Sequence, residues 1–187
     1  EDIFGDVFVQ LSNSQWVKKD HHYELDVQQW STAERVALAT KLLAQGVSRC
    51  IVGTRHLLGE GWDCPPVNCV LDLTGISASV TVNQIRGRGL RPDPNAPDKV
   101  ASLWDIISLA PGVPNGDRML NQLRDRHQNT FGIDSQGRIR SGVERIDPIF
   151  GKRFHEVLAE LTPLQQRMRE RVENMAELLA YWAVGQS

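Results

Sequence analysis

The chain of 187 residues is long enough for one domain with a sizeable core, or for one domain with an extension. Hydrophobic residues make up 41% of it and charged residues 24%, which is typical of a globular protein rather than a disordered or membrane one, and no apolar run approaches the ~20 residues that span a bilayer. The formal net charge of −2 excludes a uniformly basic surface, so any contact with nucleic acid has to be local.

The cysteines and a histidine pair bear on redox state and metals. The three cysteines are odd in number and form no C-x-x-C pair: Cys50, Cys64 and Cys69. They indicate reduced thiols and a cytoplasmic protein, with a disulfide or a zinc site as the less favoured alternative. The adjacent His21 and His22 have no ligand partners at metal spacing. We therefore predict no metal site in this chain.

The first clear element is a helix. Residues 1–22 stay unassigned, because residues 7–11 are a plausible strand but residues 12–22 show no clear period, and residues 23–27 can form a short strand. Residues 31–34 read Ser-Thr-Ala-Glu, a capping box in which the serine hydroxyl and the glutamate carboxylate satisfy free amides at a helix start. Apolar residues then recur at helical spacing up to Gly46, a helix-ending glycine. These signals predict a helix over 32–45.

Alternating strands and helices follow. The runs 50–52 and 69–73 are short, apolar and bounded by loop residues, which indicates buried parallel strands of an α/β sheet. A helix is predicted over 77–90 and a further strand over 100–107. This order is compatible with a parallel α/β lobe.

The pattern changes beyond residue 111. Residues 117–128 can form a helix with Leu120 and Leu123 inward. Two β-like runs, 130–133 and 138–146, can then form a hairpin. Its arginines can either grip a phosphate backbone or stand in solvent, and both interpretations stay open: Arg138, Arg140 and Arg145.

A long helix is predicted to close the chain. Residues 162–165 read as a second capping box, with Pro163 at the first helical position. One stripe of the helix is too apolar to leave in water, so we expect it to pack against another surface: Leu164, Met168, Val172, Met175, Leu179 and Trp182.

The predicted helix 77–90 carries charged residues in a pattern that suggests chemistry. Gln84, Arg88 and Arg91 are spaced i, i+4, i+7 and share one face. A different face is apolar or small: Ala78, Val82, Ile85 and Gly89. Each glycine inside a helix costs roughly 1 kcal/mol relative to alanine, so Gly87 and Gly89 indicate close approach of a ligand or another backbone.

A glycine-flanked loop precedes that helix. Residues 61–63 read Gly-Trp-Asp, and Thr54 follows the predicted strand 50–52. Such a loop lets backbone amides reach an anion. The alternative interpretation makes Asp63 a turn residue, and Trp62 fits a core position.

Together the two segments resemble motifs V and VI of superfamily 2 helicases. Residues 84–91 match Q-x-x-G-R-x-x-R of motif VI, and residues 53–54 and 61–63 match motif V. DEAD-box proteins carry histidine where Gln84 stands, so the similarity is to the non-DEAD-box branch. The resemblance covers about residues 23–110 and implies a RecA-like parallel-sheet lobe, followed by an α+β C-terminal extension over 111–187.

The resemblance also implies roles for individual residues. Arg88 and Arg91, with Gln84, would be the catalytic group that meets the γ-phosphate of ATP. Positioned guanidinium groups stabilise the charge that spreads over the transferred phosphoryl group. By the same resemblance, Gly61 and Asp63 would bind the nucleotide. Thr54 and Arg55 would bind the nucleic acid. The alternative without a function for the two arginines is a basic helix face exposed to solvent.

The triphosphate-binding half is expected elsewhere. The chain contains no G-x-x-x-x-G-K-[ST], since Gly151-Lys152 is followed by Arg153, and it begins at Glu1 without an initiator methionine. We therefore expect ATP and Mg²⁺ to be held by an N-terminal RecA-like lobe of a longer protein, and this chain alone to be inactive.

The sequence thus predicts the second motor lobe of an ATP-dependent helicase or translocase acting on nucleic acid, with DNA favoured over RNA and no membrane partner. The alternative is a nucleic-acid-binding scaffold that keeps the fold without hydrolysis. A dinucleotide-binding enzyme does not fit, because Gly87 and Gly89 lie inside a predicted helix rather than in a strand-to-helix turn.

Overall fold

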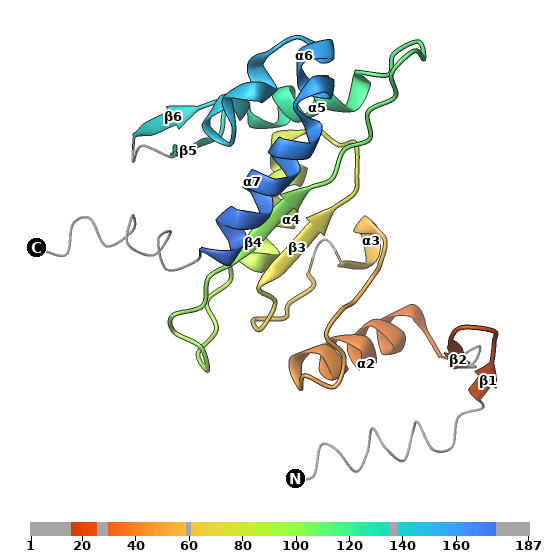
Figure 1. Ribbon diagram of the computed structural model, residues 1–187. Coiled ribbons are helices and arrows are strands. Elements are labelled where there is room, and N and C mark those ends of the chain that lie inside the picture. Colours follow the sequence, from red (N-terminus) through yellow and green to blue (C-terminus); the bar gives the residue numbers. More distant parts are fainter. Residues whose placement is uncertain (1–15, 26–29, 59–60, 135–137, 175–187) are drawn as a thin grey trace, which may run out of the picture. The chain divides into compact units, whose positions relative to one another are not determined.

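The computed structural model describes residues 16–25, 30–58, 61–134 and 138–174 (Figure 1). The chain divides into two compact units. The first unit comprises residues 1–67 and 91–97, and the second comprises residues 68–90 and 98–187.

The first unit contains a short hairpin. Strand β1 (Trp16–Lys18) pairs antiparallel with strand β2 (Tyr23–Leu25), so that Trp16 lies opposite Leu25. The strand predicted at residues 23–27 is therefore confirmed in its described part. Its partner, β1, lies inside the stretch that showed no sequence period. It was not predicted, because pairing between strands is a non-local property.

Helix α2 (Thr32–Ala44) forms where the sequence predicts it, and its capping box is present. The Glu34 amide donates to Ser31 Oγ at 3.2 Å, and the Ser31 amide donates to Glu34 Oε2 at 2.7 Å. These bonds lower the pKa of the Glu34 carboxyl. At the other end Gly46 has φ +72°, a conformation that favours glycine, and its amide donates to the Leu43 carbonyl at 3.1 Å.

The strand predicted over residues 50–52 is wrong. Among the described residues no strand pairs with this run, and Val52 is 92% exposed. An extended apolar run becomes a strand only when a neighbour takes up its amides and carbonyls. The chain continues instead into the single-turn helix α3 (Arg55–Leu58).

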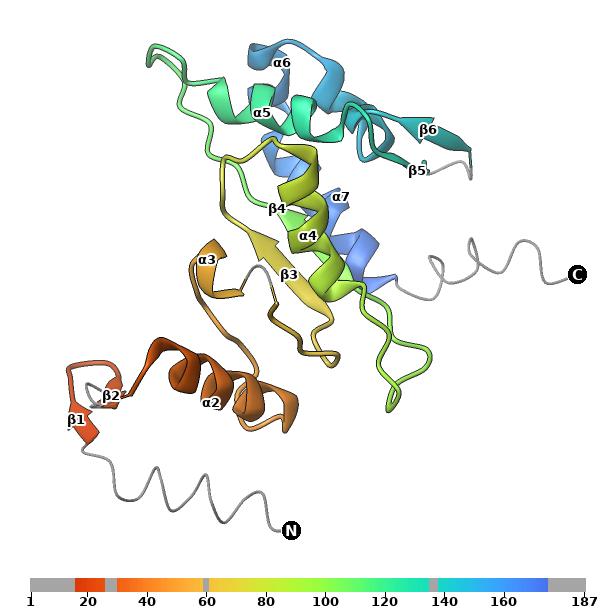
Figure 2. The same ribbon diagram turned by 180° about the vertical axis from the view of Figure 1, so that it is seen from behind.

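The second unit is built on a small parallel sheet. Strand β3 (Cys69–Asp72) pairs with strand β4 (Ser102–Asp105), and Asp72 lies opposite Asp105 at the carboxyl end. Helix α4 (Ser79–Gly89) connects the strands and packs on them (Figure 2). The predicted strands 69–73 and 100–107 and helix 77–90 are confirmed with shorter bounds. This part of the chain is mixed α/β.

Only part of that sheet is buried. Val70 faces helix α4, where a Cβ built on Gly89 would lie 3.1 Å from Val70 Cγ2 and 3.1 Å from Leu103 Cδ2. Leu71 alternates to the opposite face and is 55% exposed. The expectation of strands buried on both faces is therefore wrong for β3, because the described elements cover it incompletely.

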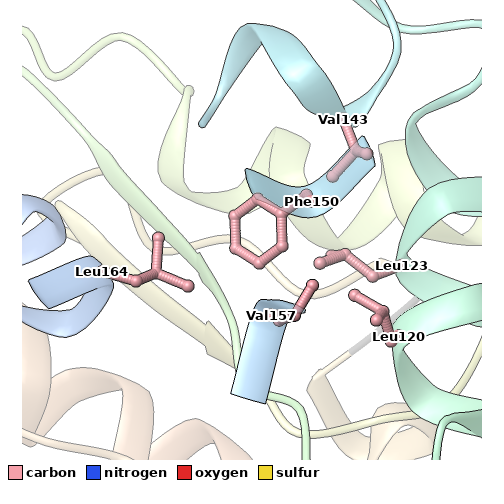
Figure 3. Close-up of a cluster of buried hydrophobic side chains, with 6 residues drawn as sticks. All are labelled: Leu120, Leu123, Val143, Phe150, Val157 and Leu164. Carbon is pink, nitrogen blue, oxygen red and sulfur yellow. The ribbon is translucent and has the colours of Figure 1, made fainter. Parts of the chain in front are cut away.

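The rest of the second unit surrounds an apolar core. Helix α5 (Arg118–His127) supplies Leu120 and Leu123, both buried as predicted. The other core residues come from the turns η1 (Val143–Arg145) and η2 (Pro148–Gly151) and from helices α6 (Phe154–Ala159) and α7 (Leu161–Glu173), as Figure 3 shows: Val143, Phe150, Val157 and Leu164. Ile107 and Leu109, just after β4, pack against this cluster. The core therefore ties the later helices to the sheet.

The predicted hairpin forms, but its second strand is short. Strand β5 (Phe131–Ile133) pairs antiparallel with strand β6 (Ile139–Ser141), while residues 135–137 of the turn lie outside the described residues. The strand predicted to reach residue 146 ends at Ser141. Gly142 follows with φ +83° and turns the chain into η1.

The closing helix starts earlier than predicted. Helix α7 begins at Leu161 with Glu160 at its cap, so the capping box at residues 162–165 is wrong. Pro163 is tolerated in the first turn, where its missing amide has no intrahelical partner. In the predicted stripe Leu164 is buried and Met168 packs against the core. Three stripe positions lie outside the described residues: Met175, Leu179 and Trp182.

None of the helices that the structure describes combines the length and the apolar character needed to cross a lipid bilayer.

Candidate nucleotide-contact residues and a buried charge cluster

Arg91 and Asp63 form an ion pair in the first unit. Helix α4 ends at Gly89 and the Leu90 amide caps it by donating to the Arg86 carbonyl at 3.3 Å, so Arg91 lies beyond the helix. The expectation that Arg91 continues one helical face with Gln84 is therefore wrong. The guanidinium of Arg91 instead donates to Asp63 Oδ1. Both side chains are more than a third exposed.

The loop that carries Asp63 is fixed by its neighbours. Gly61 has φ +78°, so the turn itself favours glycine there. The Trp62 indole donates to Thr40 Oγ1 of helix α2 at 2.7 Å, and Cys64 is buried. Trp62 is half-buried, close to the core position predicted for it. Asp63 thus projects from a loop that is anchored on both sides.

The two residues assigned to nucleic acid also lie in the first unit. Thr54 precedes helix α3, and its carbonyl accepts from the amides of Leu57 and Leu58 at 3.0 and 3.1 Å. Arg55 is the first residue of that helix. Both side chains are exposed. Both side chains are therefore accessible to a nucleic-acid strand. Helix α3, which carries Arg55, is only one turn long.

Gln84 and Arg88 lie on helix α4 in the second unit. Gln84 is exposed and Arg88 is half-buried, whereas Val82 and Gly89 on the apolar face are buried. The two glycines have different surroundings. A side chain on Gly89 would press on the sheet, whereas no atom of the described residues lies within 4 Å of a Cβ built on Gly87. The close approach of strands β3 and β4 to helix α4 thus explains the glycine at residue 89. The space beside Gly87 is open.

A buried charge cluster that was not predicted lies where strands β3 and β4 end. Arg126 of helix α5 donates from Nη1 to Asp72 Oδ2 at 3.1 Å and to Asp105 Oδ1. Arg86 of helix α4 donates to Asp105 Oδ2 at 3.1 Å. The side chain of Arg126 is 3% exposed. Each buried charge therefore has a partner of opposite sign, as burial requires.

His127 completes the cluster as a neutral imidazole. An arginine can only donate, and guanidinium groups lie at both ring nitrogens: Arg145 is 3.1 Å from Nδ1 and Arg86 is 3.0 Å from Nε2. Nε2 also lies 2.9 Å from Asp105 Oδ2. Burial lowers the pKa of His127, against the effect of its bond to Asp105, and the charge of Arg86 lowers it further.

Asp105 is the acceptor that the cluster shares. Burial raises the pKa of its carboxyl, but the hydrogen bonds from His127 and Arg126 and the charges of Arg86 and Arg126 outweigh burial and leave the pKa well below its usual range. Asp105 therefore stays ionised between two guanidinium groups. Burial lowers the pKa of Arg145 in the same neighbourhood.

One sequence signal could have indicated this cluster. Asp72 and Asp105 each end an apolar run, and the carboxyl ends of adjacent parallel strands lie together. Arg126 and His127 had no comparable signal, because arginine is mostly exposed and nothing in the local pattern of α5 sets it apart.

The hairpin arginines differ from one another. Arg138 and Arg140 are exposed and both pair with Asp134 Oδ2, at 2.9 and 3.1 Å. Arg145 points instead to His127 and to the Thr130 carbonyl, at 3.3 Å. Arg145 is therefore engaged inside the unit rather than in a phosphate grip, while the two hairpin arginines remain at the surface.

Comparison with known proteins gives no relative, because no family model, no curated protein and no solved structure matches the chain.

Proposed function

We propose that this chain is the second motor lobe of an ATP-dependent superfamily 2 helicase or translocase of the non-DEAD-box branch. The observation that carries the proposal is the ion pair between Asp63 and Arg91. It joins the aspartate of the motif V-like loop to the last arginine of the motif VI-like pattern.

The character of this pair suits a site that receives a phosphate. Exposed ion pairs contribute about 0–1 kcal/mol, so Arg91 can exchange a carboxylate for a phosphate oxygen at small cost. A planar guanidinium binds both groups in the same bidentate manner. Asp63 would hold Arg91 ready before the nucleotide arrives.

Arg88 has a separate task in this proposal. Phosphoryl transfer spreads negative charge over the equatorial oxygens, and an arginine positioned there is worth roughly 10³ to 10⁵ in rate in other systems. Arg88 lies on a helix that is packed on a sheet, so its backbone is held by the fold. Gln84, one turn earlier and exposed, would accompany it at the nucleotide.

The open space beside Gly87 supports contact with something outside the second unit. A glycine inside a helix is costly, and no atom of the residues that the structure describes comes close enough to explain it there. We assign that position to the approach of ATP, which a P-loop lobe would hold together with Mg²⁺. Nucleic acid, with DNA favoured, would contact Thr54 and Arg55 in the first unit.

The test is ATP turnover by the longer protein that includes a P-loop lobe. The proposal expects Mg²⁺-dependent phosphate release that single-stranded nucleic acid stimulates. Binding of nucleic acid without any phosphate release would favour the inactive scaffold instead. The 187-residue chain alone serves as the negative control, and phosphate release by it would contradict the division between lobes.

A further inference from the structure

We propose that Arg126 is a positioning residue that fixes helix α4, and with it the direction in which Arg88 is presented. The inference deepens the proposed function and rests on it for the role of Arg88. It assigns to a helix of the C-terminal extension a part in the chemistry of the motor.

The side chain of Arg126 contacts the link that leads into helix α4 and the carboxyl ends of strands β3 and β4. Its Nε donates to the Ile76 carbonyl at 2.9 Å, and its Nη2 donates to the Thr74 carbonyl at 2.6 Å. Both carbonyls belong to the link between β3 and α4. Its Nη1 meanwhile grips Asp72 and Asp105. One buried guanidinium therefore fastens the start of the link to the carboxyl ends of both strands.

The link has further bonds that limit its freedom. The Thr74 amide donates to Asp72 Oδ1 at 2.8 Å, so the same carboxylate holds the link and Arg126. A Cβ built on Gly75 would lie 2.9 Å from Gln122 Oε1 of helix α5. Helix α5 thus lies directly against the link.

Arg86 fixes the rotation of helix α4 about its own axis. Its guanidinium donates to Asp105 Oδ2, the oxygen that also lies 2.9 Å from His127 Nε2, while Arg126 donates to the other oxygen of the carboxylate. Residues two apart on a helix point about 200° apart, so Arg88 is directed away from the face that carries Arg86. Of these two arginines, Arg86 anchors the helix, and Arg88 is the one that the proposed function assigns to the nucleotide.

Only an arginine can satisfy the geometry at residue 126. The guanidinium presents donors in two directions of one plane, toward two carbonyls and toward two carboxylates. A lysine keeps the charge but offers its donors from a single point. Arg126→Lys should therefore keep the ion pairs with Asp72 and Asp105 and lose the hydrogen bonds to the backbone carbonyls of the link.

Helix α5 supplies a matched control at Arg124. It also donates to backbone carbonyls, from Nε to Phe150 O at 2.8 Å and from Nη2 to Lys152 O, and to Asn121 Oδ1 at 2.9 Å. These contacts reach η2 and its cap, not the link. Arg124→Lys tests the loss of an arginine fork in the same helix without touching α4.

The first experiment is hydrogen exchange on the 187-residue chain. Arg126→Lys should speed exchange of amides in residues 73–90 by about tenfold or more, the result of losing roughly 1.4 kcal/mol of local protection. Residues 161–173 should change much less, and Arg124→Lys should leave residues 73–90 as in the wild type. Unchanged exchange over 73–90, or an equal increase everywhere, would overturn the positioning role. If Arg126→Lys does not fold, Arg86→Lys removes the second anchor and is judged by the same criterion.

The second experiment uses the longer protein with its P-loop lobe. Affinity is measured for Mg-ADP alone and for Mg-ADP with aluminium fluoride, which imitates the transferred phosphoryl group. Arg126→Lys should weaken the second complex by about tenfold and the first by less than about twofold, because only the transition-state charge meets Arg88. A merely structural loss would weaken both equally and would contradict the proposal.

A double-mutant cycle connects the two residues. If Arg126 acts through Arg88, Arg126→Lys should have no further effect on aluminium fluoride binding in a protein that already carries Arg88→Ala. Additive effects would overturn the proposal. If the wild-type protein binds Mg-ADP with aluminium fluoride no more tightly than it binds Mg-ADP alone, the proposed function fails. Hydrogen exchange then still decides whether Arg126 positions the helix.

Discussion

Asp63 and Arg91 form an ion pair across 28 residues of sequence, between a loop anchored on helix α2 and the segment that follows helix α4. The pair is exposed on both sides. It is therefore a weak contributor to folding.

The first prediction separates stability from activity at this pair. Asp63→Asn and Arg91→Gln, singly and together, should show a coupling in the free energy of unfolding of at most about 1 kcal/mol. In the longer protein each single change should lower ATP turnover several-fold more than that loss of stability explains. Urea unfolding and phosphate release at matched temperature measure the two effects. A coupling of several kcal/mol with normal turnover would make the pair a structural one.

The second prediction concerns pH. The pKa of His127 is lowered by burial, so below its ordinary value of 6.5 the unfolded chain takes up a proton that the folded chain does not. The free energy of unfolding should therefore fall as the pH drops from 7 to 5, by at most about 1.4 kcal/mol per pH unit from this group. The pKa of Asp105 is also lowered, so its stabilisation is lost in turn as the pH falls below 3.8.

His127→Gln identifies the group responsible. A glutamine can accept from Arg145 and donate to Asp105, yet it does not titrate. Urea unfolding of this variant should lose most of the slope between pH 7 and 5 and keep the decline below pH 4. An unchanged slope between pH 7 and 5 would show that another group controls it.

The third prediction contrasts the two glycines of helix α4. Gly89→Val pushes a side chain into Val70 and Leu103 and should destabilise the chain by about 1–3 kcal/mol. Gly87→Val meets open space and should be close to neutral, since valine is no worse than glycine in a helix. Thermal unfolding of the two variants makes the comparison. Equal losses would show that the surroundings of the two glycines do not differ.

Gly87→Val has a further use in the longer protein. If ATP approaches the helix there, the added side chain should raise KM for ATP while the fold remains intact. Normal KM and turnover would place the nucleotide elsewhere.

The fourth prediction addresses nucleic acid. Thr54→Val removes a hydroxyl whose bond to a phosphate is worth about 0.5–1.5 kcal/mol, or up to roughly twice that with a charged group. Stimulation of ATP turnover by single strands should weaken, while basal turnover survives. Binding is compared at a stated salt concentration, because phosphate contacts depend on it. Loss of basal turnover as complete as that caused by Arg88→Ala would remove Thr54 from this role.

Elements whose signals are local could be predicted from the sequence. The capping box at Ser31 and the glycine at residue 46 bound helix α2 within one residue, because both act through their immediate neighbours. The run at residues 50–52 has the composition of a strand, but its conformation depends on a partner that residues 48–54 cannot reveal. The same limit hid strand β1, whose partner is β2.

The candidate site shows the same division. The pattern from Gln84 to Arg91 is visible in the sequence, yet helical spacing alone placed Arg91 on a helix that ends at Gly89. Arg86 was passed over, because nothing local distinguishes an arginine turned toward Asp105 from one in solvent. The partners of Arg126 are 21 to 54 residues away, so only the fold brings them together.

The most direct measurement is ATP turnover by the longer protein with Arg88→Ala, beside Arg138→Ala as a control in the exposed hairpin. The account predicts that Arg88→Ala lowers turnover by roughly 10³-fold or more, as loss of an arginine finger does elsewhere. Affinity for nucleic acid without nucleotide should change little, and Arg138→Ala should hydrolyse ATP as the wild type does. Turnover within about twofold of wild type in Arg88→Ala would contradict the assignment of this chain as a motor lobe.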